Sequence, residues 1–249
     1  MGIFTKRRIL AGGVLFVIIV SVILGGFILW VLDYSPAMEE AKAALLSDDE
    51  VKVQTDNWFA FTPKNASYSL GFIFYPGGKV DPVAYAPLAK NIAKEGFLVL
   101  IVPMTLNLAV LSPNRASEVI NTYSNISTWV IGGHSLGGVM AADFASRNLN
   151  SITGLILLAS YPPDTVDLSD SDIAVISISA TLDGVINTQS FNSTKENLPS
   201  NTTYVSIEGG NHAQFGWYGD QAGDNEASIS REAQQVEIVD AIVTFLNSL

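Results

Sequence analysis

Apolar residues divide the chain into one long N-terminal run and a series of short internal runs. The first run, Ile9 to Leu32, contains 24 consecutive residues without a charged side chain. At about 1.5 Å of rise per residue, a helix of this length reaches roughly 36 Å, which is enough to cross a bilayer with some tilt. The run predicts one transmembrane helix over residues 9–32.

Two other interpretations of this run are a cleaved signal peptide and a buried core helix. The apolar part of a signal peptide is normally only about 7–15 residues long, and no small-residue cleavage site follows directly. The run is apolar on every face and begins beside the basic cluster Lys6, Arg7 and Arg8, which is unlike a core helix. We therefore favour a retained anchor, and the signal peptide stays open as the alternative.

The charges that flank the run predict how the chain is oriented in a membrane. The basic cluster precedes the run, whereas Asp33, Glu39 and Glu40 follow it. Because Lys and Arg favour the cytoplasmic side, we expect a single-pass protein with a cytoplasmic N-terminus and its main domain on the extracytoplasmic side. The predicted organisation is a basic cytoplasmic segment (1–8), a transmembrane anchor (9–32), a stem (33–50) and one α/β domain (51–249).

Beyond the anchor, short apolar runs alternate with segments of helical pattern. The runs are rich in branched residues, as is typical of buried parallel strands. Strands are expected at Val51–Val53, Trp58–Phe61, Gly71–Tyr75, Phe97–Val102, Trp129–Gly132, Gly154–Ala159, Ile173–Ser179 and Thr203–Ile207. Helices are expected at Ala37–Leu46, Pro82–Lys94, Pro113–Tyr123, Leu136–Asn148 and from Ile229 to the C-terminus, with Ser112 as an N-cap. This alternation predicts a mostly parallel central sheet flanked by helices.

Composition narrows the classes of partner and cofactor. Residues 33–249 carry 10 basic and 24 acidic side chains, a formal net charge of −14, which argues against a nucleic-acid partner. The absence of cysteine excludes disulfides, a cysteine nucleophile and thiolate metal sites. The two histidines and scattered carboxylates form no pattern of metal-ligand spacing, so we expect no metal and no required cofactor.

The strongest chemical motif is the pentapeptide Gly133-His134-Ser135-Leu136-Gly137, which lies between a predicted strand and a predicted helix. A G-x-S-x-G sequence in this context is typical of a nucleophile elbow, where glycines permit a sharp turn that exposes the serine hydroxyl. The alternative is a Gly-rich turn in which Ser135 only caps the following helix. We predict that Ser135 is a nucleophile.

A serine nucleophile needs a general base and a carboxylate that orients the base. His134 is expected to point away from its neighbour's hydroxyl, which leaves His212, in a Gly-rich loop after the last predicted strand, as the base. Asp183 follows the strand ending at Ser179 and is expected at the same sheet edge, so it is the predicted acid. The alternatives are an ordinary surface or core histidine and an Asp-Gly turn that caps a helix.

Stabilisation of an oxyanion requires backbone donors close to the nucleophile. An apolar strand runs into Tyr75-Pro-Gly-Gly-Lys79, where Gly78 is the first choice for a donor N–H and Lys79 the second. The N–H of Leu136, at the positive end of its helix, is the second predicted donor. No phosphate-binding loop pattern surrounds Lys79, so we do not expect a nucleotide site.

These segments, in the order Gly77-Gly78, Gly133 to Gly137, Asp183-Gly184 and His212, resemble the α/β-hydrolase superfamily and especially its small dienelactone-hydrolase-like branch. The resemblance covers about residues 70–249 and implies an α/β-hydrolase fold with a Ser-His-Asp triad. Dienelactone hydrolases use a cysteine nucleophile, whereas this chain has Ser135 at the matching position. The resemblance therefore implies a serine esterase acting on a small-molecule or exposed ester.

The sequence also bears on how open the site is and on which other functions the same motifs allow. The segment between Tyr161 and Asp172 is Pro- and Asp-rich and leaves no room for a large lid, so we expect an open, shallow site. A peptidase or an acyltransferase would use the same triad. A catalytically inactive binding module and a membrane-tethered scaffold are alternatives from another class.

Overall fold

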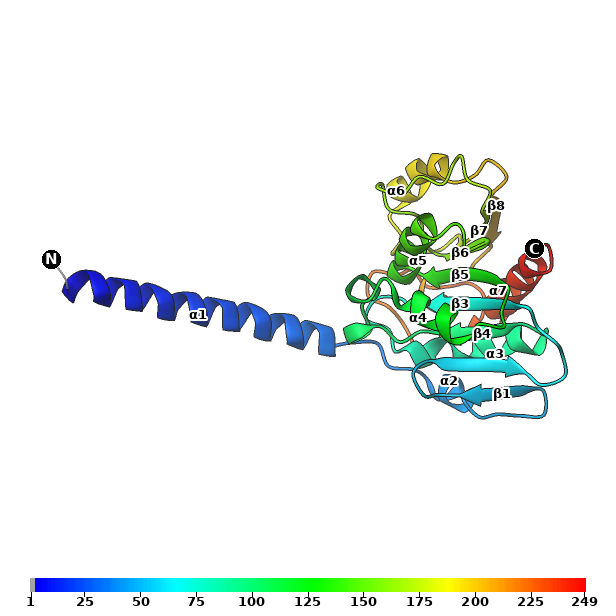
Figure 1. The fold of residues 1–249 in the computed structure, drawn as a ribbon, viewed down its shortest axis with the longest axis horizontal. Coiled ribbons are helices and arrows are strands. Elements are labelled where there is room, and N and C mark those ends of the chain that lie inside the picture. The colour runs from blue at the N-terminus through cyan, green and yellow to red at the C-terminus, as the bar shows by residue number, and fades with distance from the viewer. Residues whose placement is uncertain (1–2) are drawn as a thin grey trace. The chain divides into compact units, whose positions relative to one another are not determined.

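The computed structural model describes residues 3–249, with side chains from residue 11 onward (Figure 1). The α-helices are α1 (Ile3–Leu32), α2 (Glu39–Ala43), α3 (Ala86–Lys94), α4 (Arg115–Thr122), α5 (Leu136–Arg147), α6 (Thr188–Ser193) and α7 (Arg231–Leu246). The strands are β1 (Val51–Gln54), β2 (Phe59–Pro63), β3 (Leu70–Tyr75), β4 (Leu98–Ile101), β5 (Thr128–His134), β6 (Gly154–Leu158), β7 (Ala174–Ala180) and β8 (Thr203–Ile207). Short 3₁₀ helices are η1 (Pro82–Tyr85), η2 (Thr105–Asn107), η3 (Ala109–Leu111), η4 (Thr194–Asn197) and η5 (Ala213–Phe215).

The strands form one sheet in the order β1-β2-β4-β3-β5-β6-β7-β8. All pairs from β4 to β8 are parallel, and only the pairs β1-β2 and β2-β4 are antiparallel. The two strands predicted earliest in the chain therefore form the antiparallel edge of the sheet. The mostly parallel sheet predicted from the alternating pattern is confirmed.

Alternating side chains of the strands divide the core into two layers, one on each face of the sheet. On β3, Phe72 and Phe74 pack in the layer that contains α3 and α7, whereas Ile73 and Tyr75 pack in the layer that contains α4 and α5. Both faces of the parallel strands are buried, which explains their almost continuous apolar sequence. The parallel arrangement places the carboxyl ends of β3, β5 and β7 at one edge of the sheet, where the loops carry the candidate site residues.

Several helix boundaries differ from the sequence prediction. The helix expected from Pro113 begins at Arg115, and its N-cap residue is Asn114, not Ser112. The Ser112 hydroxyl instead donates to Thr105 Oγ1 at 2.5 Å, so a contact within the preceding loop replaces the expected cap. The helix predicted over Ala37–Leu46 is limited to α2, and α6 was not predicted at all. No helix or strand lies between Tyr161 and Asp172, which confirms that no large lid is inserted there.

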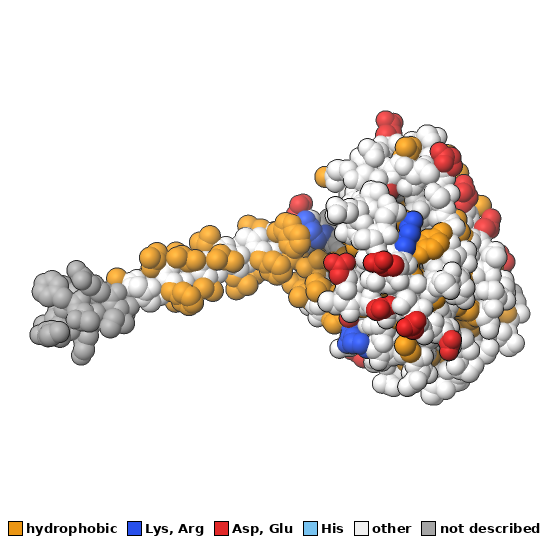
Figure 2. Space-filling model, turned by 90° about the horizontal axis from the view of Figure 1, so that it is seen from above, with side chains coloured by type: hydrophobic (Ala, Val, Ile, Leu, Met, Phe, Trp, Pro, Cys, Tyr) orange, Lys and Arg blue, Asp and Glu red, His pale blue; other side chains and the backbone are white. Residues whose placement is uncertain are grey.

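The chain divides into a unit that ends at Tyr34 and a unit Ser35–Leu249. Helix α1 begins at Ile3, earlier than the predicted Ile9, and its segment Ala11–Leu32 is long and apolar enough to cross a membrane. Figure 2 shows apolar side chains along this helix and scattered acidic side chains on the visible face of the second unit. Residues 33–50 were predicted as a stem. Of these, residues 35–50 belong to the second unit and include α2, whose Ala41 is buried in the core beside α3.

Candidate functional site

The candidate nucleophile occupies a strained turn between β5 and α5. Ser135 has φ 52° and ψ −124°, a conformation that L-residues other than glycine rarely adopt. Its N–H donates to the Leu158 carbonyl at 3.0 Å, and its own carbonyl accepts from the Ser160 hydroxyl at 2.8 Å. These bonds to β6 and to the residues after it hold the turn in its strained conformation.

The two outer glycines of the pentapeptide are required by close packing. A Cβ atom at Gly137 would collide with the carbonyl oxygens of Tyr75 and Pro76, and one at Gly133 would collide with Tyr75 and with Gly137 itself. The start of α5 therefore passes directly over the end of β3. The G-x-S-x-G spacing reflects this contact between strand, turn and helix, which supports the predicted elbow.

Asp183 and His212 are joined by a short hydrogen bond between loops that follow β7 and β8. His212 Nδ1 and Asp183 Oδ2 are 2.8 Å apart, and both side chains are almost fully buried. The other carboxylate oxygen, Oδ1, accepts from the N–H groups of Val185 and Ile186, each at 2.8 Å. The carboxylate is thereby fixed in orientation, and it fixes the imidazole ring in turn.

The second imidazole nitrogen, Nε2 of His212, is buried and has no hydrogen-bond partner among the described residues. His212 and Ser135 line the same pocket of about 240 Å³. The other lining residues are Leu136, Val139, Ala159, Ser160, Tyr161, Val185, Ile186 and Asn187. Because its outer nitrogen is unpaired, the His212 imidazole can accept a proton in this pocket. The hydrogen bond between a general base and the group it deprotonates often tightens only when substrate binds.

The predicted oxyanion donors lie side by side. A Cβ atom at Gly78 would lie 3.0 Å from Leu136 Cδ2 and 3.4 Å from Leu136 Cβ. In the described part of the chain, neither backbone N–H donates to another group. The Lys79 N–H, our second choice, instead donates to the Asn107 carbonyl at 2.8 Å, so that choice was wrong.

His134, the other histidine, is buried behind His212. Its Nδ1 shares a 2.9 Å hydrogen bond with the Tyr85 hydroxyl, which also accepts from the Gly77 N–H at 3.1 Å. The rings of His134 and His212 are 4.4 Å apart. Burial, followed by the electrostatic interaction with the His212 imidazole, lowers the pKa of His134 well below 6.5, so this ring stays neutral. Tyr85 thus connects the Gly77-Gly78 segment to the elbow, a link that the sequence did not reveal.

Asp224 was also missed by sequence reasoning. Its Oδ1 accepts from the Gly184 N–H at 2.9 Å and its Oδ2 accepts from the Ala213 N–H at 2.8 Å. These two donors are the residues that directly follow Asp183 and His212 along the chain. Asp224 therefore bridges the two loops that carry the hydrogen-bonded pair.

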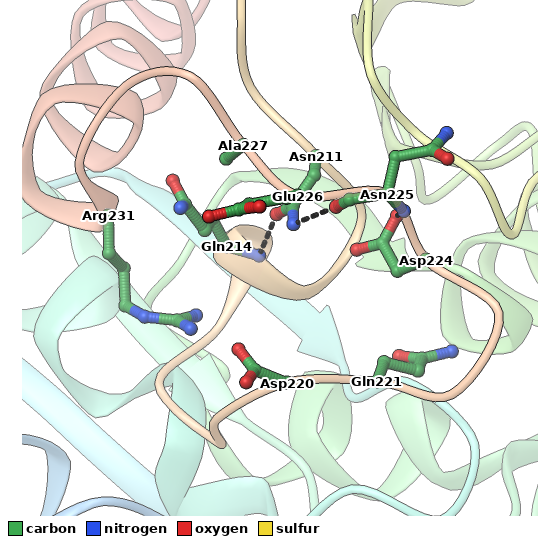
Figure 3. Close-up of a pocket in the computed structure, with 9 residues that line it drawn as sticks. All are labelled: Asn211, Gln214, Asp220, Gln221, Asp224, Asn225, Glu226, Ala227 and Arg231. Carbon is green, nitrogen blue, oxygen red and sulfur yellow. Dashed lines mark hydrogen bonds between the residues drawn. The ribbon is translucent and has the colours of Figure 1, made fainter.

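A polar cavity of about 520 Å³ lies beside this bridge. Its lining includes Asn211, Asp224, Asn225 and Arg231 (Figure 3). The Asn211 side chain donates to the Asn225 carbonyl at 2.7 Å and accepts from the Gln214 N–H at 3.1 Å. The Arg231 guanidinium donates to the carbonyls of Ala213, Gly216 and Gly219. The cavity is larger than the pocket at Ser135, but its polar groups mainly brace the histidine loop.

Metal ligation has no visible basis in the part of the chain that the structure describes. Among those residues, no group of three or more His, Asp or Glu side chains is placed to hold a metal ion. The chemistry available at the edge of the sheet is that of a hydroxyl, an imidazole, a carboxylate and backbone N–H donors.

Solved structures with the same fold cover most of this chain. A predicted CIB-like hydrolase from Thermoplasma acidophilum is 16% identical with a TM-score of 0.60, over 80% of this chain and 100% of its own. Est1E from Butyrivibrio proteoclasticus, solved with ferulic acid, is 13% identical with a TM-score of 0.56, over 81% and 98%. A thermophilic esterase from Thermogutta terrifontis is 14% identical with a TM-score of 0.51, over 80% and 93%.

At these identities the structural likenesses establish the fold alone, and the match to the dienelactone-hydrolase-like branch stays a prediction. No curated protein sequence matches the chain. A sequence model of the alpha/beta hydrolase family matches residues 71–236, the segment that contains the elbow, Asp183, His212 and Asp224. The chain belongs to the alpha/beta hydrolase family.

Proposed function

We propose that this chain is a serine hydrolase that cleaves carboxylic esters through Ser135, His212 and Asp183. The observation that carries the proposal is the pocket shared by Ser135 and His212, in which the Asp183-bound imidazole keeps a buried, unpartnered Nε2. His134 also has a buried Nε2 without a partner among the described residues, but His212, and not His134, is bonded to a carboxylate and lines the pocket with Ser135. The family membership supports hydrolysis as the reaction class.

In the proposed acylation step, Ser135 Oγ attacks the ester carbonyl carbon while His212 Nε2 accepts the hydroxyl proton. The carbonyl oxygen becomes an oxyanion, which the N–H groups of Gly78 and Leu136 stabilise. The bond between the carbonyl carbon and the alcohol oxygen then breaks, and His212 returns the proton to the departing alcohol. Asp183 holds the imidazole in the tautomer that presents Nε2 and stabilises the imidazolium that forms.

Deacylation repeats the sequence with water as the nucleophile. His212 Nε2 takes one proton from water, and the hydroxide attacks the acyl carbon under the same oxyanion donors. Collapse of the tetrahedral intermediate breaks the bond to Ser135 Oγ, which regains a proton from His212. The carboxylic acid leaves and the enzyme returns to its starting state without any cofactor.

The size of the pocket favours a small acyl group. Its volume of about 240 Å³ lies below the roughly 300–1,000 Å³ common for sites that enclose drug-sized ligands. Val139, Val185 and Ile186 provide its apolar lining. A short acyl chain therefore fits in the pocket, while the alcohol part of the ester extends outside it.

We also propose that residues 9–32 anchor the enzyme in a membrane, with residues 1–8 in the cytoplasm and the catalytic domain on the opposite side. The apolar segment Ala11–Leu32 supports this proposal, as does the basic cluster at Lys6, Arg7 and Arg8. Protease accessibility of the domain in intact cells tests the orientation. Resistance of the domain in intact cells, with cleavage after lysis, would contradict it.

The esterase proposal is tested with the purified full chain and p-nitrophenyl esters from acetate to decanoate. We expect hydrolysis that is fastest for short acyl chains and abolished in Ser135→Ala. Ser200→Ala, which changes an exposed serine between η4 and β8, is the matched control and should retain activity. A folded chain that hydrolyses none of these esters would favour an inactive binding module. Cleavage of peptide substrates, or acyl transfer to an added alcohol, would favour the other uses of the same triad.

A further inference from the structure

The first residue of the catalytic unit is hydrogen-bonded to the segment that carries Gly78. The Ser35 N–H donates to the Lys79 carbonyl at 2.8 Å, and the Asp81 N–H donates to the Ser35 carbonyl at 2.9 Å. Ser35 and Val80 form a parallel β-bridge. The start of this unit is therefore held beside the proposed oxyanion donor.

Very little chain separates this point from the apolar helix. Only Asp33 and Tyr34 lie between Leu32, the last residue of α1, and Ser35. Three steps of fully extended chain cover at most roughly 11 Å, since each residue adds about 3.3–3.6 Å. This limit follows from chain connectivity alone and holds for every direction of the helix. A membrane that contains the helix to its end must then have its surface close to Ser35.

A loop beside Gly78 has the composition of a membrane contact. We define the rim loop as residues 104–112, which include η2 and η3. The loop is fixed to the Gly78 segment by the bond from the Lys79 N–H to Asn107, and Leu108 Cδ2 lies 3.8 Å from the position of a Cβ at Gly78. Contacts between η3 and α5 extend this attachment to the helix that follows Ser135.

The rim loop exposes large apolar side chains in an otherwise acidic domain. Leu106, Val110 and Leu111 are 47%, 52% and 47% exposed. No charged residue occurs between Glu95 and Arg115, although residues 33–249 carry a net charge of −14. A group of exposed apolar residues without charges is typical of surfaces that contact a membrane or a protein. The short connection to the apolar helix favours the membrane.

We infer that the rim loop contacts the bilayer surface and that the site at Ser135 acts on short-chain acyl esters of amphiphiles that reside in that bilayer. The inference rests on the proposed esterase function and on the proposed anchor. The small pocket accepts the acyl group, while the rim loop and the short connection at Asp33 and Tyr34 keep the oxyanion side of the site at the lipid surface. The apolar part of the substrate stays in the membrane during the reaction.

A reporter on the rim loop tests the contact itself. Because the chain contains no cysteine, Val110→Cys and Val236→Cys each provide a single attachment site for an environment-sensitive fluorophore. Val236 is 58% exposed on α7, which packs on the opposite face of the sheet from α5. In phosphatidylcholine vesicles that hold the full chain, lipids with a headgroup-proximal nitroxide should quench the label at 110 strongly and the label at 236 weakly. Equal quenching at both positions would overturn the inference.

The consequence for substrate choice is tested with two acetate esters that share the acyl group. The full chain in vesicles is assayed with water-soluble p-nitrophenyl acetate and with hexadecyl acetate dissolved in the bilayer. The triple variant L106S/V110S/L111S should lose activity on hexadecyl acetate by about tenfold or more, because it loses the apolar contact with the bilayer, and keep its p-nitrophenyl acetate rate. A 20-residue Gly/Ser insertion between Tyr34 and Ser35 should produce the same selective loss.

The two esters separate the failure of this inference from the failure of the proposed function. If the unaltered chain hydrolyses p-nitrophenyl acetate but neither variant changes the hexadecyl acetate rate, the membrane inference is overturned and the esterase stands. If the unaltered chain hydrolyses neither ester, the proposed function fails, and the inference about substrate fails with it. If the triple variant loses both activities, its circular dichroism spectrum identifies misfolding, and the insertion variant, which leaves the rim loop unchanged, decides the substrate question.

Discussion

The two sides of the proposed active site are built differently. On the acid-base side, Asp183 and His212 are buried, hydrogen-bonded to each other and bridged from behind by Asp224. On the oxyanion side, Gly78 has no side chain and borders the rim loop, where Leu106 is exposed to solvent. In the proposed mechanism, proton transfer therefore depends on a fixed, polar framework, whereas the proposed oxyanion side borders exposed apolar residues.

The Asp183→Asn variant tests the proposed acid of the triad. Asp183→Asn keeps the size of the side chain but removes the charge that stabilises the His212 imidazolium and selects its tautomer. We expect kcat on p-nitrophenyl acetate to fall by about 10⁴-fold, the scale seen when the acid of a serine triad is neutralised. Asp172→Asn, an exposed residue before β7, is the control and should leave kcat unchanged. A tenfold effect or less at Asp183 would assign the acid to another carboxylate.

Asp224→Asn tests whether the bridge behind the triad positions it. An amide presents one acceptor oxygen, so the bonds from Gly184 and Ala213 cannot both be kept. A displacement of His212 should lower kcat by about 10–100-fold and leave KM nearly constant. Asp220→Asn is the matched control, because Asp220 lines the same cavity and, among the described residues, makes no hydrogen bond to these loops. If Asp224→Asn and Asp220→Asn lowered kcat equally, Asp224 would have no positioning role.

Tyr85→Phe tests the link between the two sides. The change leaves the Gly77 N–H and His134 Nδ1 without their shared partner in a buried site, which should cost about 1–3 kcal/mol of unfolding free energy. Thermal and denaturant unfolding measure the loss, with the exposed Tyr204→Phe as the reference. We also expect a smaller decrease in kcat, because Gly78 follows Gly77 directly. A fully stable Tyr85→Phe variant would show that the hydroxyl contributes little.

The smallest expected effect is a pH dependence of folding stability that comes from His134. Its pKa is lowered in the folded state, so below its unfolded value of 6.5 the unfolded chain binds more protons than the folded one. The contribution of this group to stability is therefore complete above pH 6.5 and decreases as the pH falls, by at most about 1.4 kcal/mol per pH unit. His134→Asn should show a shallower fall in melting temperature between pH 7 and 5. Parallel curves for both proteins would contradict the assignment.

The sequence predicted those features that depend on local pattern. Buried parallel strands carry continuous apolar runs, and the elbow requires glycines at fixed spacing, so β3 to β8 and the turn at Ser135 were recognisable. His212 followed from the small number of histidines, and Asp183 from its place directly after β7. These residues lie together because the carboxyl ends of parallel strands meet at one edge of the sheet.

Features that depend on contacts between distant segments were not predictable. Asp224 is one of 24 acidic residues, and only the folded loop brings its two oxygens to Gly184 and Ala213. Tyr85 and His134 are 49 residues apart in the chain, and no periodicity joins them. Ser112 has the composition of an N-cap, yet its hydroxyl bonds to Thr105 because the loop folds back on itself. The backbone N–H of Lys79 was excluded as an oxyanion donor only by its hydrogen bond to the Asn107 carbonyl.

The central claim is that Ser135 is an activated nucleophile, and covalent labelling tests it most directly. The full chain is treated with a fluorophosphonate, and the site of the adduct is mapped by mass spectrometry. The chain contains 24 serines, and this mapping distinguishes Ser135 from the others. The account predicts a single adduct on Ser135, formed far more slowly in His212→Asn. No adduct on the folded chain, an adduct on another serine, or an equal rate in His212→Asn would contradict it.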